Sequence, residues 1–141
     1  MSDEMAPLVF LYDRCASRNQ RDLRSRLLGC HTYVDRMGWA LAGHGPWRDL
    51  GPDALSAHRP ALTAMAAAMR EARGSRQVLC LVHNWGRLAS DDTHRLMLQQ
   101  RIIQVGGYTM TTFGESDRHT LRAVLVGRQS WALDSGGPRS A

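Results

Sequence analysis

The stretch Leu8-Val9-Phe10-Leu11-Tyr12, with the polar segment Asp13-Arg14-Cys15-Ala16-Ser17-Arg18-Asn19-Gln20 after it, decides the fold of this 141-residue chain. Five apolar residues without polar alternation predict a strand that is buried on both faces, as in a parallel sheet. The polar segment predicts a loop, and a helical pattern follows it. Ligand sites of open α/β sheets lie outside the carboxyl ends of the strands, so we look for chemistry in this loop first.

The rest of the chain repeats the order of strand, loop and helix. Further strands are predicted at 39–42, 78–82 and 108–113, and 48–58 is predicted to be a loop because it contains glycine, proline and serine. Helices are predicted from three sets of apolar residues, namely Leu23, Leu27, Cys30 and Val34 in 19–37, Leu62, Met65, Ala66 and Met69 after Pro60, and Leu96, Met97, Ile103 and Val105 after Ser90. The predicted helix ends are Ser17 or Asn19 as the first N-cap, Gly38 after the first helix, and Ser90 as the third N-cap.

This order predicts an α/β fold with three layers: a mostly parallel sheet of four to five strands, with helices on both faces. We expect one domain over 7–133 and a flexible tail over 134–141, where paired glycines and a proline occur. The segment 117–133 is ambiguous. Ser116 before it favours a helix, whereas 120–126 also fits a strand.

The charge of the chain points toward anionic partners. Its 18 basic residues are all arginine, and they outnumber 13 acidic residues to give a net charge of +5. Guanidinium groups are always charged and bind phosphate in a bidentate manner, so nucleic acid is a compatible partner. No apolar run is long enough to span a membrane, and the acidic first residues do not resemble a signal peptide. We therefore expect a cytoplasmic protein without a membrane partner.

Metal and cofactor sites are not predicted. The three cysteines are widely spaced and the six histidines are scattered, so no metal-ligand spacing occurs. The pair Gly43 and Gly45 lacks the third glycine and the helix start of a dinucleotide-binding loop.

The segment Tyr12-x-Arg14 directly after the first strand resembles the opening of the serine recombinase (resolvase/invertase) catalytic domain. On this pattern Arg14 matches the first catalytic arginine, and Ala16 occupies the position of the nucleophilic serine. Ser17 matches the threonine that follows the nucleophile, and Gln20 matches a glutamine near the start of the first helix.

The resemblance continues through two later loops. The residues Asp49-Leu50-Gly51 and, further on, His58-Arg59-Pro60-Ala61-Leu62 match a family segment in which Arg59 takes the second arginine position. The third arginine position falls on Arg87 within Trp85-Gly86-Arg87-Leu88-Ala89-Ser90-Asp91. Here Gly86 replaces the family's aspartate and Ser90 replaces its last arginine.

The resemblance implies phosphoryl transfer on DNA. In the family a serine attacks the phosphodiester, and arginines stabilise the charge of the transition state. Arg14, Arg59 and Arg87 keep that role in the pattern, but Ala16 has no atom that can act as a nucleophile. Loss of the aspartate is expected to loosen the neighbouring arginines.

Three functions remain open at this point. The first is a serine recombinase-like domain that does not cut DNA, binds phosphate or the DNA backbone weakly, and dimerises with itself or with an active recombinase. Its binding residues would be Arg14, Arg18, Gln20, Arg59 and Arg87. The second is an active strand transferase that uses Ser17 as its nucleophile with Arg14, Arg59 and Arg87. The third is a protein–protein interaction module that keeps only the fold.

Overall fold

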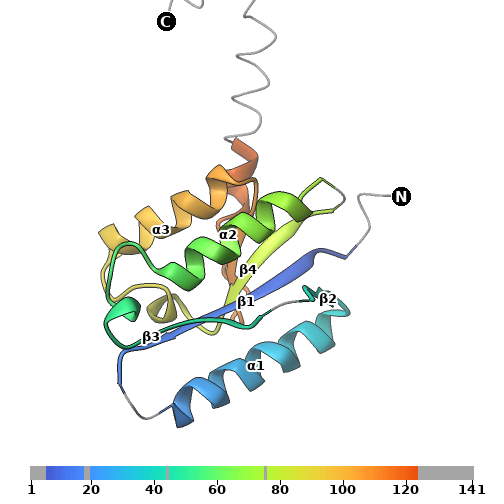
Figure 1. Cartoon of the computed structure of the whole chain (residues 1–141). Helices are drawn as coiled ribbons and strands as arrows, with labels where there is room; N and C mark the ends of the chain where they lie inside the picture. Colours follow the sequence, from blue (N-terminus) through green and yellow to red (C-terminus); the bar gives the residue numbers. More distant parts are fainter. Residues whose placement is uncertain (1–5, 18–19, 44, 75, 124–141) are drawn as a thin grey trace, which may run out of the picture.

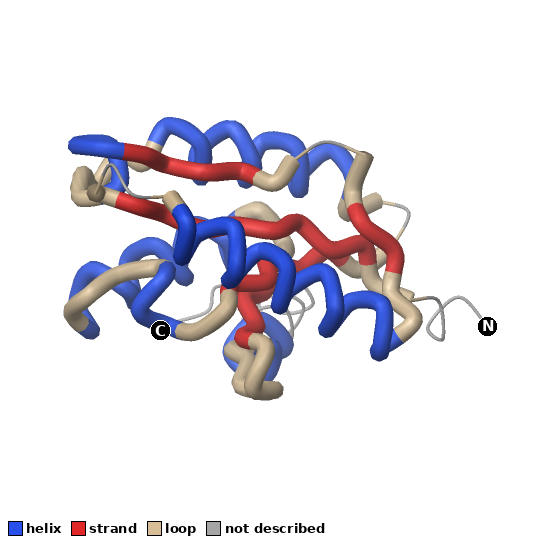
Figure 2. The backbone as a smooth tube through the Cα atoms, turned by 90° about the horizontal axis from the view of Figure 1, so that it is seen from below, coloured by secondary structure: helices blue, strands red, loops and turns tan. Residues whose placement is uncertain are grey.

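The computed structural model describes residues 6–17, 20–43, 45–74 and 76–123, and it has three layers. A sheet separates helix α1 (Arg21–Met37) on one face from helices α2 (Pro60–Ala72) and α3 (Asp92–Gln104) on the other (Figure 1). Figure 2 views the molecule from below, and α1 crosses there in front of the strands. The predicted α/β fold with a parallel sheet and helices on both faces is confirmed.

The sheet contains five strands, and all of their pairings are parallel. The strands are β1 (Leu8–Cys15), β2 (Ala40–Leu41), β3 (Trp47–Leu50), β4 (Val78–Val82) and β5 (Tyr108–Thr111). Their order is β2-β1-β4-β5, and β3 also pairs with β1. Figure 1 shows β2 and β3 following one another alongside β1, which is the central strand of the fold.

Strand β1 supplies side chains to both layers of the core. Val9 and Leu11 pack in the cluster that contains the buried face of α1. Phe10 and Tyr12 pack in the cluster that contains the buried residues of α2 and α3. Alternate residues of a strand point to opposite faces, so the same rule assigns a face to each polar residue at the end of β1.

The helix faces predicted for α1 and α2 are confirmed. All eight apolar residues of the two predicted stripes are buried. Gly38 follows α1 with a φ of 71°, and its backbone N–H bonds to the helix carbonyls. Glycine adopts this left-handed conformation without the clash of a Cβ atom, which explains why the helix ends there.

Two boundaries near β1 were predicted wrongly. Strand β1 runs on through Cys15, because β3 pairs with its last four residues. The same pairing shows that Trp47–Leu50 is a strand and not part of a loop. Strand β3 cannot be predicted from an apolar pattern, because residues 48 and 49 are charged and only Asp49 of the strand is buried. The 3₁₀ helix η2 (Gly51–Ala54) follows it.

The predicted helix caps and the third helix face also need correction. Gln20 occupies the N-cap position of α1 without a side-chain bond, so Ser17 is not the cap, and Asn19 lies outside the described residues. Asp91 and not Ser90 caps α3, because its carboxylate accepts from the His94 N–H at 2.7 Å. Of the predicted apolar stripe, Ile103 and Val105 are buried as expected, but Leu96 and Met97 are exposed. The residues of α3 that face the core are Leu98, Gln99, Ile102 and Ile103.

The chain after β5 begins as a helix. Residues 118–123 are helical, and the Ser116 Oγ accepts from the Arg118 N–H at 3.2 Å. This confirms the helical alternative as far as residue 123. The rest of the ambiguous segment and the expected tail at 134–141 lie outside the described residues. No helix in the described ranges is long and apolar enough to cross a membrane.

Candidate anion-binding site

One strand end and two connecting segments bring the arginines predicted from the resemblance to one edge of the sheet. Arg14 lies near the end of β1, Arg59 directly precedes α2, and Arg87 ends the 3₁₀ helix η3 (Trp85–Arg87) that follows β4. The Arg87 Nη1 donates to the Arg14 carbonyl oxygen at 3.3 Å. Burial lowers the pKa of the Arg14 guanidinium, and the positive charges of Arg59 and Arg87 lower it further. The three cations are therefore electrostatic neighbours.

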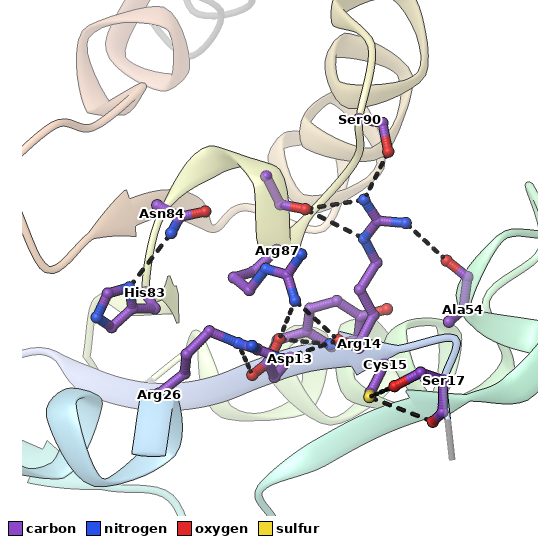
Figure 3. Close-up of polar contacts among 12 residues, drawn as sticks. Asp13, Arg14, Cys15, Ser17, Arg26, Ala54, His83, Asn84, Arg87 and Ser90 are labelled. Carbon is purple, nitrogen blue, oxygen red and sulfur yellow. Dashed lines mark hydrogen bonds and ion pairs between the residues drawn. The ribbon is translucent and has the colours of Figure 1, made fainter. Parts of the chain in front are cut away.

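Arg14 directs its guanidinium into the protein (Figure 3). Its Nε and Nη2 both donate to the Gly86 carbonyl oxygen, at 3.2 and 2.8 Å. Its Nη1 donates to the Ala54 carbonyl at 3.2 Å, and Nη2 also donates to the Ser90 Oγ at 3.0 Å. Gly86 and Ser90 stand where the family has an aspartate and an arginine, and both hold Arg14 in place. Arg14 has these acceptors in place of the aspartate, and the expected loosening of the neighbouring arginines stays a prediction.

Arg59 is fully buried and has an unusual backbone conformation. Its φ of 49° lies in the left-handed region, which is costly for a residue that carries a side chain. The Nε donates to the Ser56 carbonyl at 2.8 Å, and Nη1 donates to the Tyr12 hydroxyl at 3.1 Å. The Nη2 is buried without a hydrogen-bond partner among the described residues.

Tyr12 connects Arg59 to the start of α2. The Tyr12 hydroxyl donates to the Asp49 carboxylate at 2.7 Å. That carboxylate also accepts from the backbone N–H groups of Ala61 and Leu62, at 2.7 and 3.1 Å. Burial and the hydrogen bond to Asp49 raise the pKa of Tyr12 far above its ordinary value, so its hydroxyl keeps its proton. Asp49 therefore both caps α2 and fixes the hydroxyl that receives Arg59.

Arg87 is the most exposed of the three arginines, since about a quarter of its side chain (26%) is exposed. Its Nη1 lies 3.9 Å from the Asp13 carboxylate, which is almost completely buried. Arg26 of α1 binds the same carboxylate more closely, at 2.8 Å. Burial raises the pKa of Asp13, and the Arg26 guanidinium opposes that rise. Asp13 thus offsets part of the positive charge on the α1 side of the site.

The predicted nucleophile position and the serine after it lie beyond the end of β1. Ala16 and Ser17 are both exposed in the chain after β1. The Ser17 Oγ lies 3.6 Å from the Cys15 Sγ, and Cys15 belongs to the core on the α1 face. In Figure 3 Cys15 and Ser17 lie below the strand, whereas the guanidinium group of Arg14 lies above it.

Two further predicted binding residues have no observed role at the site. Gln20 is half-buried at the start of α1, where its carbonyl oxygen accepts from the Arg24 N–H at 3.1 Å. Arg18 lies outside the described residues. Within the described part of the chain, no group of three or more His, Cys, Asp and Glu side chains could hold a metal ion.

The sequence assigns no contact to three residues that organise the site. Tyr12 ends an apolar run and opens the Tyr12-x-Arg14 motif, but neither pattern indicates that its hydroxyl links two elements. The sequence pattern puts Asp13 in a loop and predicts no role for Arg26, although the two side chains form an ion pair. The carboxylate of Asp13, followed by arginines on the next helix, could have indicated an ion pair. That prediction requires knowing that β1 extends past residue 12, because only then does Asp13 have a fixed direction.

Removal of the Tyr12 hydroxyl should destabilise the fold. Tyr12→Phe leaves the buried Arg59 with a second nitrogen that lacks an acceptor, and it removes a donor from Asp49. An unsatisfied buried polar group costs about 1–3 kcal/mol, so we expect a loss of that size in the free energy of unfolding measured by urea denaturation.

Tyr33→Phe is the matched control, because Tyr33 is half-buried and its hydroxyl forms no hydrogen bond with the described residues. Its effect should stay within about 0.5 kcal/mol. Equal effects of the two substitutions would show that the Tyr12 hydroxyl does not support Arg59.

Comparison with known proteins supports the fold. No family model matches the sequence, and no curated protein matches it. Among solved structures, a resolvase family site-specific recombinase from Streptococcus pneumoniae is similar, with a TM-score of 0.62 and 17% sequence identity. The match covers 92% of this chain and 93% of that chain. The chain therefore has the fold of a resolvase-family recombinase.

Proposed function

We propose that this chain is a serine recombinase-like domain that binds DNA phosphates and does not cleave DNA. The observation that carries the proposal is Ala16, which lies exposed beyond the end of β1, at the position that the resemblance assigns to the nucleophile. A methyl group cannot attack phosphorus. The cluster itself suits phosphate, because guanidinium groups carry a permanent charge and several donors.

The contacts within the site indicate how a phosphate would bind. Arg14 already donates to three protein oxygens, and Arg59 is fully buried. Arg87 is the guanidinium that solvent reaches, so it makes the direct contact in this proposal. Arg14 and Arg59 contribute positive potential behind it. One direct contact supports only weak binding that is directed to the DNA backbone and insensitive to sequence.

A domain of this kind could act by pairing. This domain would form a dimer with a second copy of itself or with an active recombinase of the same fold. Such a dimer would contain at least one subunit that binds phosphate but cannot attack it. Such a dimer would regulate strand exchange by withholding one nucleophile. The runner-up function is an active transferase that uses Ser17, whose exposed hydroxyl is the nearest one along the chain to the nucleophile position.

The DNA-binding part is tested by fluorescence anisotropy with a labelled duplex over a range of salt concentrations. We expect measurable binding at low salt. In a plot of the logarithm of the binding constant against the logarithm of the salt concentration, Arg87→Gln should reduce the magnitude of the slope by about 0.9, the value for one lost phosphate contact.

Arg70→Gln serves as the control, because it removes the same charge from an exposed position on α2, outside the arginine cluster. It should leave the slope within experimental error of the unchanged protein. Absence of binding at low salt, or equal effects of the two substitutions, would refute the role of Arg87.

The lack of cleavage is tested by incubation with supercoiled DNA that carries recombination sites, followed by denaturing electrophoresis for a covalent protein–DNA adduct. We expect no adduct from the protein or from Ser17→Ala, because Ser17 lies with Cys15 on the α1 side of β1. An active serine recombinase provides the positive control. An adduct that disappears in Ser17→Ala would establish the runner-up function instead.

A further inference from the structure

A second group of arginines surrounds a cavity of about 290 Å³ at the other edge of the sheet. Arg73 and Arg76 lie between α2 and β4, whereas Arg118 and Arg122 belong to the helical residues 118–123. The apolar part of the lining comes from Val78, Tyr108 and Leu121. The cavity thus combines a charged rim with an apolar floor.

This cavity is separate from the candidate site described above. Val78 and Tyr108 are the first residues of β4 and β5, whereas Arg14 is the last but one residue of β1 and Arg87 lies beyond the end of β4. Parallel strands place their amino ends at one edge, and the five residues of β4 span about 17 Å. Figure 1 shows residues 118–123, in orange-red, at the top of the molecule, near the start of β4 and the end of α2.

No acidic side chain lines this cavity, and none of its four arginines forms an ion pair with a described residue. Arg76 donates through Nε to the Ala6 carbonyl oxygen at 2.9 Å. Arg118 lies over the Tyr108 ring, with its Cζ 5.6 Å from the ring centroid. Four like charges around one hollow repel each other, and a bound anion relieves that repulsion.

The backbone is shaped to admit one of these arginines. Gly106 has a φ of 89°, and a Cβ atom built on it would lie 2.7 Å from the Arg73 Nη1. A side chain at position 106 would therefore displace the Arg73 guanidinium from the rim. Glycine at position 106 adopts this φ without the strain of a Cβ atom and leaves room for the Arg73 side chain.

We propose that this cavity binds a small phosphate ester with a flat apolar body, of the size of a mononucleotide. Guanidinium groups suit a phosphate dianion, since they supply paired donors and enough charge to match it. The floor of Val78, Tyr108 and Leu121 suits a ring system, which inorganic phosphate lacks. The cavity volume of about 290 Å³ is close to the lower end of the range for small-molecule sites, about 300 Å³.

The test is isothermal titration calorimetry of the full chain with adenosine monophosphate, adenosine, inorganic phosphate and a DNA duplex as probes. Adenosine monophosphate should bind at least about tenfold more tightly than either adenosine or inorganic phosphate, because each of those lacks one half of the interaction. The double substitution Arg73→Gln/Arg118→Gln should weaken this binding by about tenfold or more.

Two controls separate this cavity from other sources of binding. Arg70→Gln removes a nearby exposed charge that does not line the cavity, and Arg87→Gln alters the candidate DNA site. Both should leave the affinity for adenosine monophosphate unchanged. Arg122→Gln, at an exposed position, should weaken binding even if the double variant proves unfolded by circular dichroism.

Several results would overturn the proposal. These are no binding of adenosine monophosphate at millimolar concentration, equal binding of adenosine monophosphate and inorganic phosphate, or an affinity unaffected by both cavity variants. Loss of duplex binding in the cavity variants, without any nucleotide binding, would identify a nucleic-acid surface instead. That last outcome would also bear on the proposed DNA site, whereas the nucleotide results alone leave the role of Arg87 untouched, so failure of the two proposals can be told apart.

Discussion

The alternation of strand β1 places Asp13 and Arg14 on opposite faces of the sheet, and the candidate site depends on this separation. Asp13 meets Arg26 on the α1 face, whereas Arg14 meets the carbonyl oxygens of Ala54 and Gly86 on the other face. Pairing with β3 extends the strand far enough to hold both residues. Without that pairing, neither the buried carboxylate nor the buried guanidinium would have a fixed direction.

The two inward-facing arginines are held by neutral oxygens and not by carboxylates. Arg14 bonds to two carbonyls and a hydroxyl, and Arg59 bonds to a carbonyl and a phenol. Burial of a cation without a paired anion is costly, and the lowered pKa of Arg14 reflects that cost. The positive potential is therefore only partly offset, by the nearby carboxylates of Asp13 and Asp49. An anion at the surface, next to Arg87, would gain from it.

The sequence predicts much of this fold, because apolar patterns report burial directly. The strands at 78–82 and 108–111 and the faces of α1 and α2 follow from them. Strand β3 does not, since it is a short strand stabilised by pairing with β1 and by the bonds of Asp49. The positions of Arg14, Arg59 and Arg87 along the chain could be matched to a family pattern, but the direction of each guanidinium group could not be predicted. Backbone carbonyl oxygens, such as that of Gly86, set this direction. Every residue type has such an oxygen, so the sequence does not show which of them will accept a hydrogen bond.

The central claim is that Arg14 and Arg59 are turned into the protein while Arg87 faces the phosphate. Nitrogen-15 NMR of the arginine Nε–H groups during titration with a short DNA duplex tests this claim most directly. The account predicts that the Arg87 signal shifts progressively, while the Arg14 and Arg59 signals stay near their starting positions and exchange slowly with solvent. Shifts of all three signals to a similar extent would contradict it, because that result would mean that the three guanidinium groups share one open phosphate site.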